Sequence, residues 1–257
     1  MSEHILVERE QGLLTLRLNR LDKKNALTAA MYAALADALE AAEQDAGVRV
    51  VMIAGSADCF TAGNDIVDFL ERPPTGPESP VFRFMRALLE FSKPVVAAVA
   101  GPAVGIGTTL LLHCDLVYVS RDARLKMPFV NLALCPEFGS SFLLPRLLGH
   151  AHAARLLLQG EGFDGEQAAA WGIAGEALAD GEATLERARE AALGLLELAQ
   201  SSLVDSKRLM KSGYIEKLRR VVREEGDLFV QRLPLPEAVE ALSAFTQRRK
   251  PDFSPFN

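Results

Sequence analysis

Short apolar runs alternate with stretches of helical spacing in this chain, and this pattern restricts its possible folds more than any other feature. Val48–Ala54 is a short β-branched run typical of a buried strand, and Val95–Ala100 and Asp115–Ser120 read as two further strands. Before the first strand, Thr28 can open a helix in which apolar residues recur every four positions. Strands that alternate with helices predict an α/β layer fold with mostly right-handed crossovers.

The remaining segments extend this pattern and then change it. His4–Glu10 and Gly12–Leu18 read as a hairpin, Val81–Phe91 reads as a helix, and Gly101–Cys114 reads as a turn that leads into a helix. From Phe138 onward the spacing is almost entirely helical. The helices predicted there are Phe138–Leu148, Ala151–Gln159, Gly165–Trp171, Glu182–Gln200, Leu203–Glu225 and Glu237–Gln247, with Gly226 and Pro234 as breaks between the last two.

One continuous domain fits the length and composition of the chain. Its 257 residues are 49% hydrophobic, which is enough to bury a sizeable core. No linker of disordered composition interrupts it. We therefore predict an α/β core over residues 1–200 and a helical region over residues 201–257, which packs on this core or on a neighbouring subunit.

Charge and cysteine content exclude several classes of protein. The net charge of −6 argues against nucleic acid as a partner, and the longest apolar stretch, residues 94–107, is broken by glycine and proline and cannot span a membrane. The N-terminus lacks the basic and apolar parts of a signal peptide. Three cysteines without CxxC spacing and four scattered histidines suggest neither a disulfide framework nor a metal site. We expect a cytoplasmic protein.

Two glycine-containing loops follow predicted strands and can present backbone N–H groups to a ligand. The stretch 59–65 contains the small Ala-Gly-Asn sequence, and the stretch 100–109 places Gly105 and Gly107 where a helix begins. The second loop has neither the Lys-Ser/Thr of a P-loop nor GxGxxG spacing. Taken singly, the first loop favours an ordinary strand-to-helix turn, whereas the second is equally compatible with close helix packing.

Glu137 is an isolated carboxylate among apolar residues, between Pro136 and Phe138. Burial there would raise its pKa towards the range useful to a general base, whereas a helix start capped by Ser140 or Ser141 would lower it. A first-turn residue favoured by the helix dipole is the alternative interpretation. With the two loops, Glu137 suggests enolate chemistry, in which two N–H groups stabilise a carbonyl oxygen while the carboxylate removes an α-proton. Loss of one such donor typically costs about 3–4 kcal/mol.

Three segments together resemble the crotonase (enoyl-CoA hydratase/isomerase) superfamily, in its order and spacing: residues 19–27, 60–65 and 101–107. The likeness covers nearly the whole chain, including residues 245–253. It implies a spiral core of ββα repeats that holds an acyl-CoA site and a helical C-terminal trimerisation region. It also implies a homotrimer or a dimer of trimers, and a CoA thioester that is substrate rather than cofactor, with no metal.

The resemblance also assigns roles to individual residues. The backbone N–H groups of Asn64 and Ile106 would form the oxyanion hole, and the segment Lys23–Leu27 would lie near the adenine. The substrate contacts implied in this way are Lys23, Lys24, Asn25, Ala26, Ala62, Gly63, Asp65, Ile66, Gly105, Phe129 and Lys250.

The departures from the family pattern point to a subclass. Hydratases of the family carry two glutamates, at positions that correspond here to Thr109 and Phe129, so hydration of 2-enoyl-CoA is disfavoured. Residues 128–141 instead resemble the peroxisomal-type Δ3,Δ2-enoyl-CoA isomerases, in which a glutamate at the position of Glu137 is the catalytic base. No acyl-CoA-binding domain precedes the core and Ser254–Asn257 is no peroxisomal signal. We therefore expect a free-standing bacterial isomerase of 3-enoyl-CoA.

Two alternatives stay open. One is another crotonase-type reaction, such as thioester hydrolysis or ring isomerisation, which a Glu137 side chain pointing away from the thioester would favour. The other is a non-catalytic acyl-CoA-binding protein, which would bind CoA esters without turnover. The walls of the acyl pocket are predicted only as the segments Ile66–Leu70 and Val81–Leu89.

Overall fold

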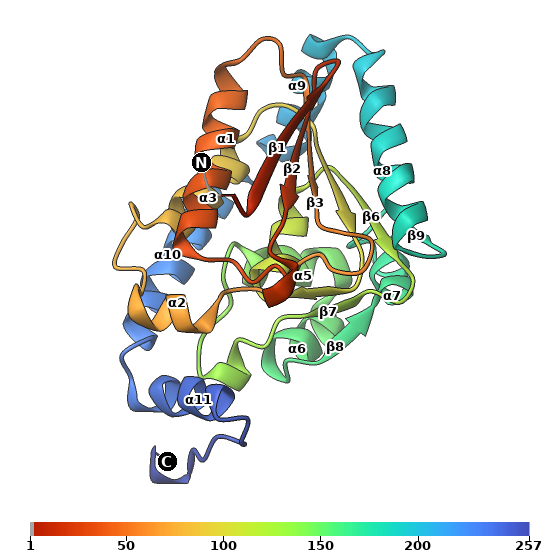
Figure 1. Cartoon of the computed structure of the whole chain (residues 1–257). Coiled ribbons are helices and arrows are strands. Elements are labelled where there is room, and N and C mark those ends of the chain that lie inside the picture. Colours follow the sequence, from red (N-terminus) through yellow and green to blue (C-terminus); the bar gives the residue numbers. More distant parts are fainter. Residues whose placement is uncertain (1–2, 257) are drawn as a thin grey trace.

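A six-stranded sheet runs through the core of the computed structural model, which describes residues 3–256 (Figure 1). Its strands lie in the order β1-β2-β3-β4-β6-β9; β1 and β2 form an antiparallel hairpin and every later pair is parallel. A smaller sheet has the order β5-β7-β8. The strands are β1 (Ile5–Glu10), β2 (Leu13–Leu18), β3 (Val50–Ala54), β4 (Val95–Val99), β5 (Pro102–Val104), β6 (Leu116–Ser120), β7 (Arg124–Lys126), β8 (Gly162–Asp164) and β9 (Glu176–Leu178).

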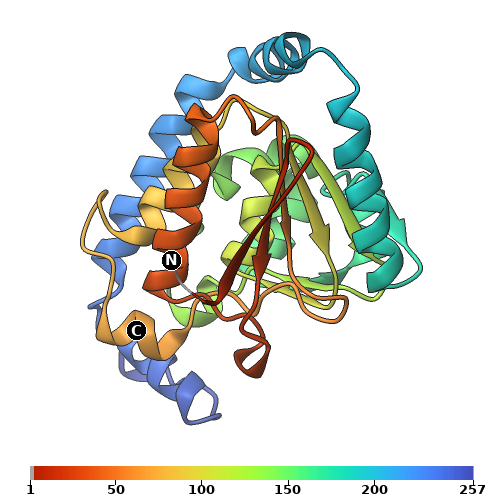
Figure 2. The same ribbon diagram turned by 45° about the horizontal axis from the view of Figure 1, so that its top comes forward.

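Helices cover both faces of the large sheet, and the strand sequences show why. Along β3, Val51 and Ile53 belong to the main core, beneath α1 (Ala29–Gln44) and α3 (Pro80–Glu90). The alternate residues of β3 pack with Ala188 and Ala192 of α8 (Gly181–Leu196) on the other face. Figure 2 shows the sheet between these two layers. Because both faces are buried, the strand reads as a continuous apolar run.

The remaining helices connect and enclose this core. α10 runs along α3, where Gly226 lies beside the Phe82 ring, and α11 contacts the 3₁₀ turn Val130–Leu132. The helices are α2 (Ile66–Glu71), α4 (Ile106–Thr109), α5 (Ser140–Leu148), α6 (His150–Leu158), α7 (Gly165–Ala170), α9 (Gln200–Ser212), α10 (Ile215–Arg232) and α11 (Pro236–Thr246).

The predicted helix Leu203–Glu225 is wrong in its extent. The structure divides it into α9 and α10 at Gly213 and Tyr214, and it places Gly226 inside α10 rather than at a helix end. An ideal Cβ at residue 226 would lie 3.1 Å from the ring of Phe82, so the position favours a residue without a side chain. Packing against α3 thus outweighs the low helix propensity of glycine.

Five short elements escaped the sequence analysis. They are α2 and the three-residue strands β5, β7, β8 and β9, which are too short to show a period. Among residues 3–256 no helix combines the length and the hydropathy needed to cross a membrane.

A buried lysine fastens α9 to the sheet. Lys207 Nζ lies 2.7 Å from Asp115 Oδ2 and donates a second hydrogen bond to the carbonyl oxygen of Lys93 at 2.8 Å. The same Asp115 oxygen accepts the backbone N–H of Val95. These bonds join the helix to the amino ends of β4 and β6. Because Lys207 is only 5% exposed, each partner satisfies a charge that water cannot reach.

Replacing Lys207 by alanine is expected to lower the free energy of unfolding by about 3–5 kcal/mol, since the partly buried Asp115 would lose its charged partner and keep only the Val95 N–H. Denaturant unfolding followed by circular dichroism measures the change. The matched control is Lys217→Ala, at an exposed position of α10. A loss no larger than that of the control would show that the ion pair adds nothing to stability.

Candidate active site

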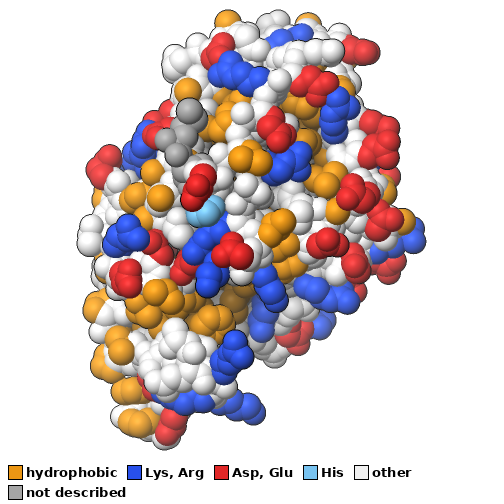
Figure 3. Space-filling view, viewed as in Figure 1, with side chains coloured by type: hydrophobic (Ala, Val, Ile, Leu, Met, Phe, Trp, Pro, Cys, Tyr) orange, Lys and Arg blue, Asp and Glu red, His pale blue; other side chains and the backbone are white. Residues whose placement is uncertain are grey.

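Segments that follow β2, β3, β5 and β7 meet and line a cavity of about 810 Å³. α11 and the tail close its outer side with Phe245, Arg248 and Arg249. In Figure 3 a recess with hydrophobic surroundings lies above α11, beside Lys and Arg side chains. The predicted site residues that line the cavity are Lys23, Ala26, Ala62, Gly63, Asn64, Asp65, Ile66, Gly105, Phe129 and Glu137.

The first loop leaves one N–H group free between two that are bonded. Gly63 donates to Thr61 Oγ1 at 3.1 Å and Asp65 donates to the carbonyl oxygen of Leu27 at 2.9 Å. The Asn64 N–H between them donates to no acceptor within residues 3–256. Gly63 has φ of 87°, and a Cβ there would lie 2.6 Å from the carbonyl oxygen of Val104, so only glycine permits this turn.

The second loop presents its free N–H at the start of α4. Gly105 donates its own N–H to the carbonyl oxygen of Lys126, whereas the next N–H, of Ile106, has no acceptor in the part of the chain described. The Ile106 side chain is fully buried in the core. Two backbone bonds join the loops: Thr61 donates to Pro102 at 2.8 Å and Val104 donates to Thr61 at 3.1 Å. Two unbonded N–H groups on joined loops are the kind of donors that an oxyanion hole requires.

Tyr32, which the sequence analysis did not single out, is bonded to the first loop and lies within electrostatic reach of Glu137. Its O–H donates a short hydrogen bond to Asn64 Oδ1. Burial raises the pKa of Tyr32 well above its usual range, and the nearby charge of Glu137 raises it further. In α1, Tyr32 occupies a core-facing position next to Met31, so nothing in the sequence pattern separates it from packing residues.

Glu137 lines the cavity, is 4% exposed, and its Oε1 has no hydrogen-bond partner among the described residues. Burial, followed by the charge of Glu225, raises the pKa of Glu137 to about 8. The N–H groups at the start of α5, which were expected to lower this pKa, donate to other acceptors. The Ser140 N–H and O–H both donate to the Glu137 carbonyl oxygen, and the N–H groups of Gly139 and Ser141 donate to Glu225. A buried carboxyl without a partner in a cleft is typical of a general base.

Asp65, the other carboxylate that lines the cavity, is already engaged. Its Oδ2 lies 2.6 Å from Arg20 Nη1, and its Oδ1 caps α2 by accepting the N–H groups of Val67 and Asp68. Although burial opposes them, these bonds hold the pKa of Asp65 below its usual range. The two positions assigned to the hydratase glutamates hold a threonine and a phenylalanine. Thr109 is buried, and Phe129 lines the cavity.

Three predicted contact residues lie outside the residues that line the cavity: Lys24, Asn25 and Lys250. Asn25 is fully buried; its amide donates to the carbonyl oxygens of Cys59 and Phe60, and its Oδ1 accepts the N–H of Arg20. It therefore holds the first donor loop in place. Lys24 and Lys250 are exposed, and their contacts with substrate stay predictions.

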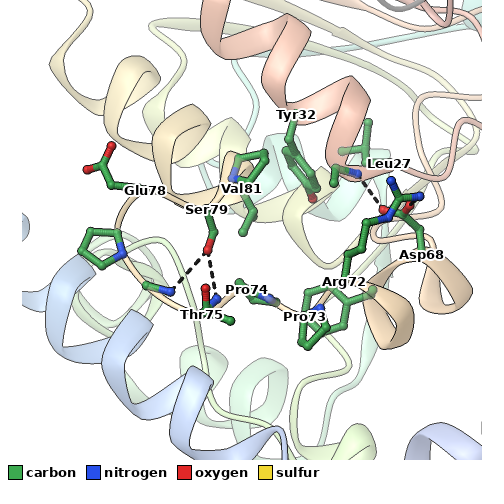
Figure 4. A pocket seen from close by; sticks show the side chains of 15 residues that line it. Leu27, Tyr32, Asp68, Arg72, Pro73, Pro74, Thr75, Glu78, Ser79 and Val81 are labelled. Atoms are coloured by element: carbon green, nitrogen blue, oxygen red, sulfur yellow. Dashed lines mark hydrogen bonds and ion pairs between the residues drawn. The ribbon is translucent and has the colours of Figure 1, made fainter.

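Figure 4 shows a second cavity, of about 480 Å³. It shares the lining residue Phe69 with the first cavity. Tyr32 and Val81 form part of its wall, and the proline-rich loop Arg72–Pro80 forms another part. Ser79 Oγ accepts the N–H groups of Thr75 and Gly76 and so fixes the loop locally. The predicted pocket walls include Phe69 and Val81 but not this loop.

Comparison with known proteins defines the class. The family model described as enoyl-CoA hydratase/isomerase matches residues 8–255, so the chain belongs to the enoyl-CoA hydratase/isomerase family. A structure of Pseudomonas aeruginosa OdaA is 68% identical, with a TM-score of 0.95, over 96% of this chain and 100% of that one. The crystal structure of an enoyl-CoA hydratase/isomerase from Pseudoalteromonas atlantica T6c gives 36% identity and a TM-score of 0.91, over 98% and 100%. The predicted crotonase-type α/β fold with a helical C-terminal region is confirmed.

Relatives of known activity include both isomerases and hydratases. The 1,2-epoxyphenylacetyl-CoA isomerase of Escherichia coli K12 is 36% identical, with 99% of both chains covered. The 2,3-dehydroadipyl-CoA hydratase of the same organism is 33% identical, over 98% of this chain and 99% of that protein. Human enoyl-CoA delta isomerase 2 is 32% identical over 96% of this chain and 64% of its own length. The protein is thus an acyl-CoA enzyme of this family, and the reaction must be argued from the site.

The burial of Glu137 predicts a pH-dependent cost to stability. Its pKa of about 8 in the folded chain exceeds the ordinary 4.5, so the folded state holds a proton that the unfolded state has lost between these values. Relative to Glu137→Gln, the wild type is expected to lose roughly 3–5 kcal/mol of unfolding free energy as the pH rises from 5 to 9. Denaturant titrations of both proteins at the two pH values measure this, and parallel stability curves would contradict it.

Proposed function

We propose that this protein is a Δ3,Δ2-enoyl-CoA isomerase, which moves the double bond of a 3-enoyl-CoA into conjugation with the thioester. The observation that carries the proposal is a single buried, unpartnered carboxylate, Glu137, at a cavity formed by two loops that each carry a free N–H group.

The proposed reaction needs only these groups. The thioester oxygen accepts hydrogen bonds from the N–H groups of Asn64 and Ile106, and Glu137 removes a proton from C2. The electron pair of the broken C–H bond forms the C2–C3 double bond, while the former C3–C4 double bond takes the proton back from Glu137 at C4. Each N–H group stabilises the intermediate dienolate oxygen by about 3–4 kcal/mol. Since no water is added, one base is sufficient.

Hydration has less support from this site. The cavity-lining carboxylates within residues 3–256 are Glu137 and Asp65, and Asp65 is bound to Arg20. Thr109 and Phe129, at the positions assigned to the hydratase glutamates, cannot activate water. Because some relatives are named as hydratases, hydration is assayed alongside isomerisation.

The substrate can be placed by charge and shape. We propose that the CoA phosphates lie at the mouth of the cavity near Lys23, Arg248 and Arg249, and that the acyl group extends past Tyr32 into the second cavity. Because CoA is part of the substrate, no separate cofactor is proposed. A ring-bearing acyl group is the second candidate, favoured by the similarity to the 1,2-epoxyphenylacetyl-CoA isomerase.

The Glu137→Gln variant is expected to lower kcat on trans-3-enoyl-CoA by roughly 10²–10⁴, because an amide cannot accept the C2 proton. Absorbance of the conjugated 2-enoyl thioester follows the reaction with short and medium acyl chains. The control is Glu43→Gln, which alters a carboxylate that accepts the N–H and O–H of Ser92 from a position on α1 outside the cavity.

Parallel assays of 2-enoyl-CoA hydration and of 1,2-epoxyphenylacetyl-CoA turnover separate the alternatives. If only the epoxide is turned over, the proposed substrate changes from a 3-enoyl-CoA to a ring-bearing acyl-CoA. Binding of CoA esters without any turnover, unchanged by Glu137→Gln, would contradict an enzymatic role.

We also propose that the chain assembles as a homotrimer. Large apolar side chains stay exposed on α6, α9 and α11: Leu158, Leu209, Met210, Val239 and Phe245. Exposed apolar groups on several helices are typical of subunit contacts. Sedimentation is expected to give three times the chain mass of 27.9 kDa, or six times for a dimer of trimers, and Met210→Glu is expected to reduce it. A single-chain mass for the wild type would contradict the proposal.

A further inference from the structure

A second buried glutamate lies behind the candidate base. Glu225 is on α10, more than eighty residues further along the chain, and is 7% exposed. Its Oε2 accepts the N–H of Gly139 at 2.5 Å, and its Oε1 accepts the N–H of Ser141 at 3.0 Å together with a short hydrogen bond from the Ser141 hydroxyl. Three donors on one carboxylate favour its ionised form.

The turn held by these bonds is strained. Phe138 has φ of 56° and Gly139 has φ of 75°, so a bulky side chain adopts the left-handed region that residues with a Cβ disfavour. Outside contacts must therefore maintain the turn. The His113 ring stacks on Phe138 with centroids 3.8 Å apart, and its Nε2 lies 2.7 Å from the Phe138 carbonyl oxygen. Glu225 holds the next residue.

α10 also holds the other end of the same segment. Arg232 Nε donates to the carbonyl oxygen of Ala133 at 2.8 Å, and Cys135 Sγ lies 3.8 Å from the carbonyl oxygen of Glu225. One helix thus fixes residues 133–141 on both sides of Glu137. Glu225 is not among the residues that line the cavity, so it acts on the base rather than on a substrate.

The charge of Glu225 acts on Glu137 as well. The titratable groups that face Glu137 are Tyr32 from α1, Cys135 from its own loop and Glu225 from α10; Arg232 faces Cys135. After burial, Glu225 is the cause that raises the pKa of Glu137. Burial also raises the pKa of Glu225, against hydrogen bonds from Ser141 and Gly139 that lower it.

We propose that Glu225 is a positioning residue for the base: by accepting hydrogen bonds from residues 139 and 141 it fixes the turn that presents Glu137 to the cavity, and its negative charge acts on the Glu137 carboxyl. The inference rests on the proposed role of Glu137 as the base.

Two variants test the charge and the hydrogen bonds. Glu225→Gln removes the charge and leaves one accepting oxygen, so it can keep the bonds from Gly139 or from Ser141 but not both. Glu225→Asp keeps the charge and both oxygens on a side chain one methylene shorter. Glu43→Gln is the control, because Glu43 is also a carboxylate that accepts N–H and O–H groups, here one of each from Ser92. Each protein is assayed with trans-3-enoyl-CoA across pH. The Glu137 carboxyl is also titrated by ¹³C NMR of glutamate-labelled protein, with Glu137→Gln providing the assignment.

In Glu225→Gln the midpoint of the Glu137 titration is expected to fall by about one pH unit, because a neighbouring negative charge is lost. The acid limb of kcat/KM should move to lower pH with it, and kcat should fall about tenfold at unchanged KM. Glu225→Asp should keep the midpoint and lose kcat. A midpoint and a kcat in Glu225→Gln that both match Glu43→Gln would overturn the proposal.

The two readouts also separate this proposal from the proposed function. If the wild type turns over no 3-enoyl-CoA, the isomerase proposal fails, but the NMR titration still decides whether Glu225 acts on Glu137. Should Glu225→Gln not fold, Ser141→Ala removes one donor to Glu225 and leaves both N–H groups. It is expected to lower kcat several-fold at unchanged KM; an unchanged kcat together with an unchanged Glu137 titration would count against the proposal.

Discussion

The two backbone hydrogen bonds between the loops after β3 and β4 are the constraint on which the site depends. Thr61 donates to Pro102, and Val104 donates back to Thr61. These two bonds join the loops that carry the N–H groups of Asn64 and Ile106. Both groups remain unbonded within the described chain, because the N–H groups beside them donate to other acceptors. Hydrogen-bond donors fixed before substrate arrives need no reorganisation during reaction, which is the source of their effect.

The parts of the site that local sequence encodes were predictable. Both donor loops follow buried strands and contain glycine, the residue that tolerates turns closed to other side chains. These two features locate Gly63 and the start of α4 without knowledge of the fold. Glu137 was recognisable as a carboxylate among apolar neighbours. What the sequence could not supply was its charge environment, because the helix start next to it donates its N–H groups to Glu225 and to the Glu137 carbonyl oxygen.

Residues whose role comes from distant packing escaped the sequence analysis. Tyr32 looks like any core residue of α1, and Glu225 follows Arg223 and Glu224 in a stretch that reads as a solvated face. Each acquires its role only where its helix meets a loop from elsewhere in the chain. Asn25 shows the opposite error. The sequence analysis assigned it to substrate binding, whereas its side chain supports the backbone of residues 59 and 60.

The loop Arg72–Pro80 forms a wall of the second cavity, yet its own turn is fixed by the bonds from Thr75 and Gly76 to Ser79. None of these bonds reaches Asn64, Ile106 or Glu137. The length and composition of this wall can therefore change without disturbing the groups proposed for catalysis. Such independence allows one scaffold to keep its proposed proton-transfer groups while the shape of the second cavity diverges.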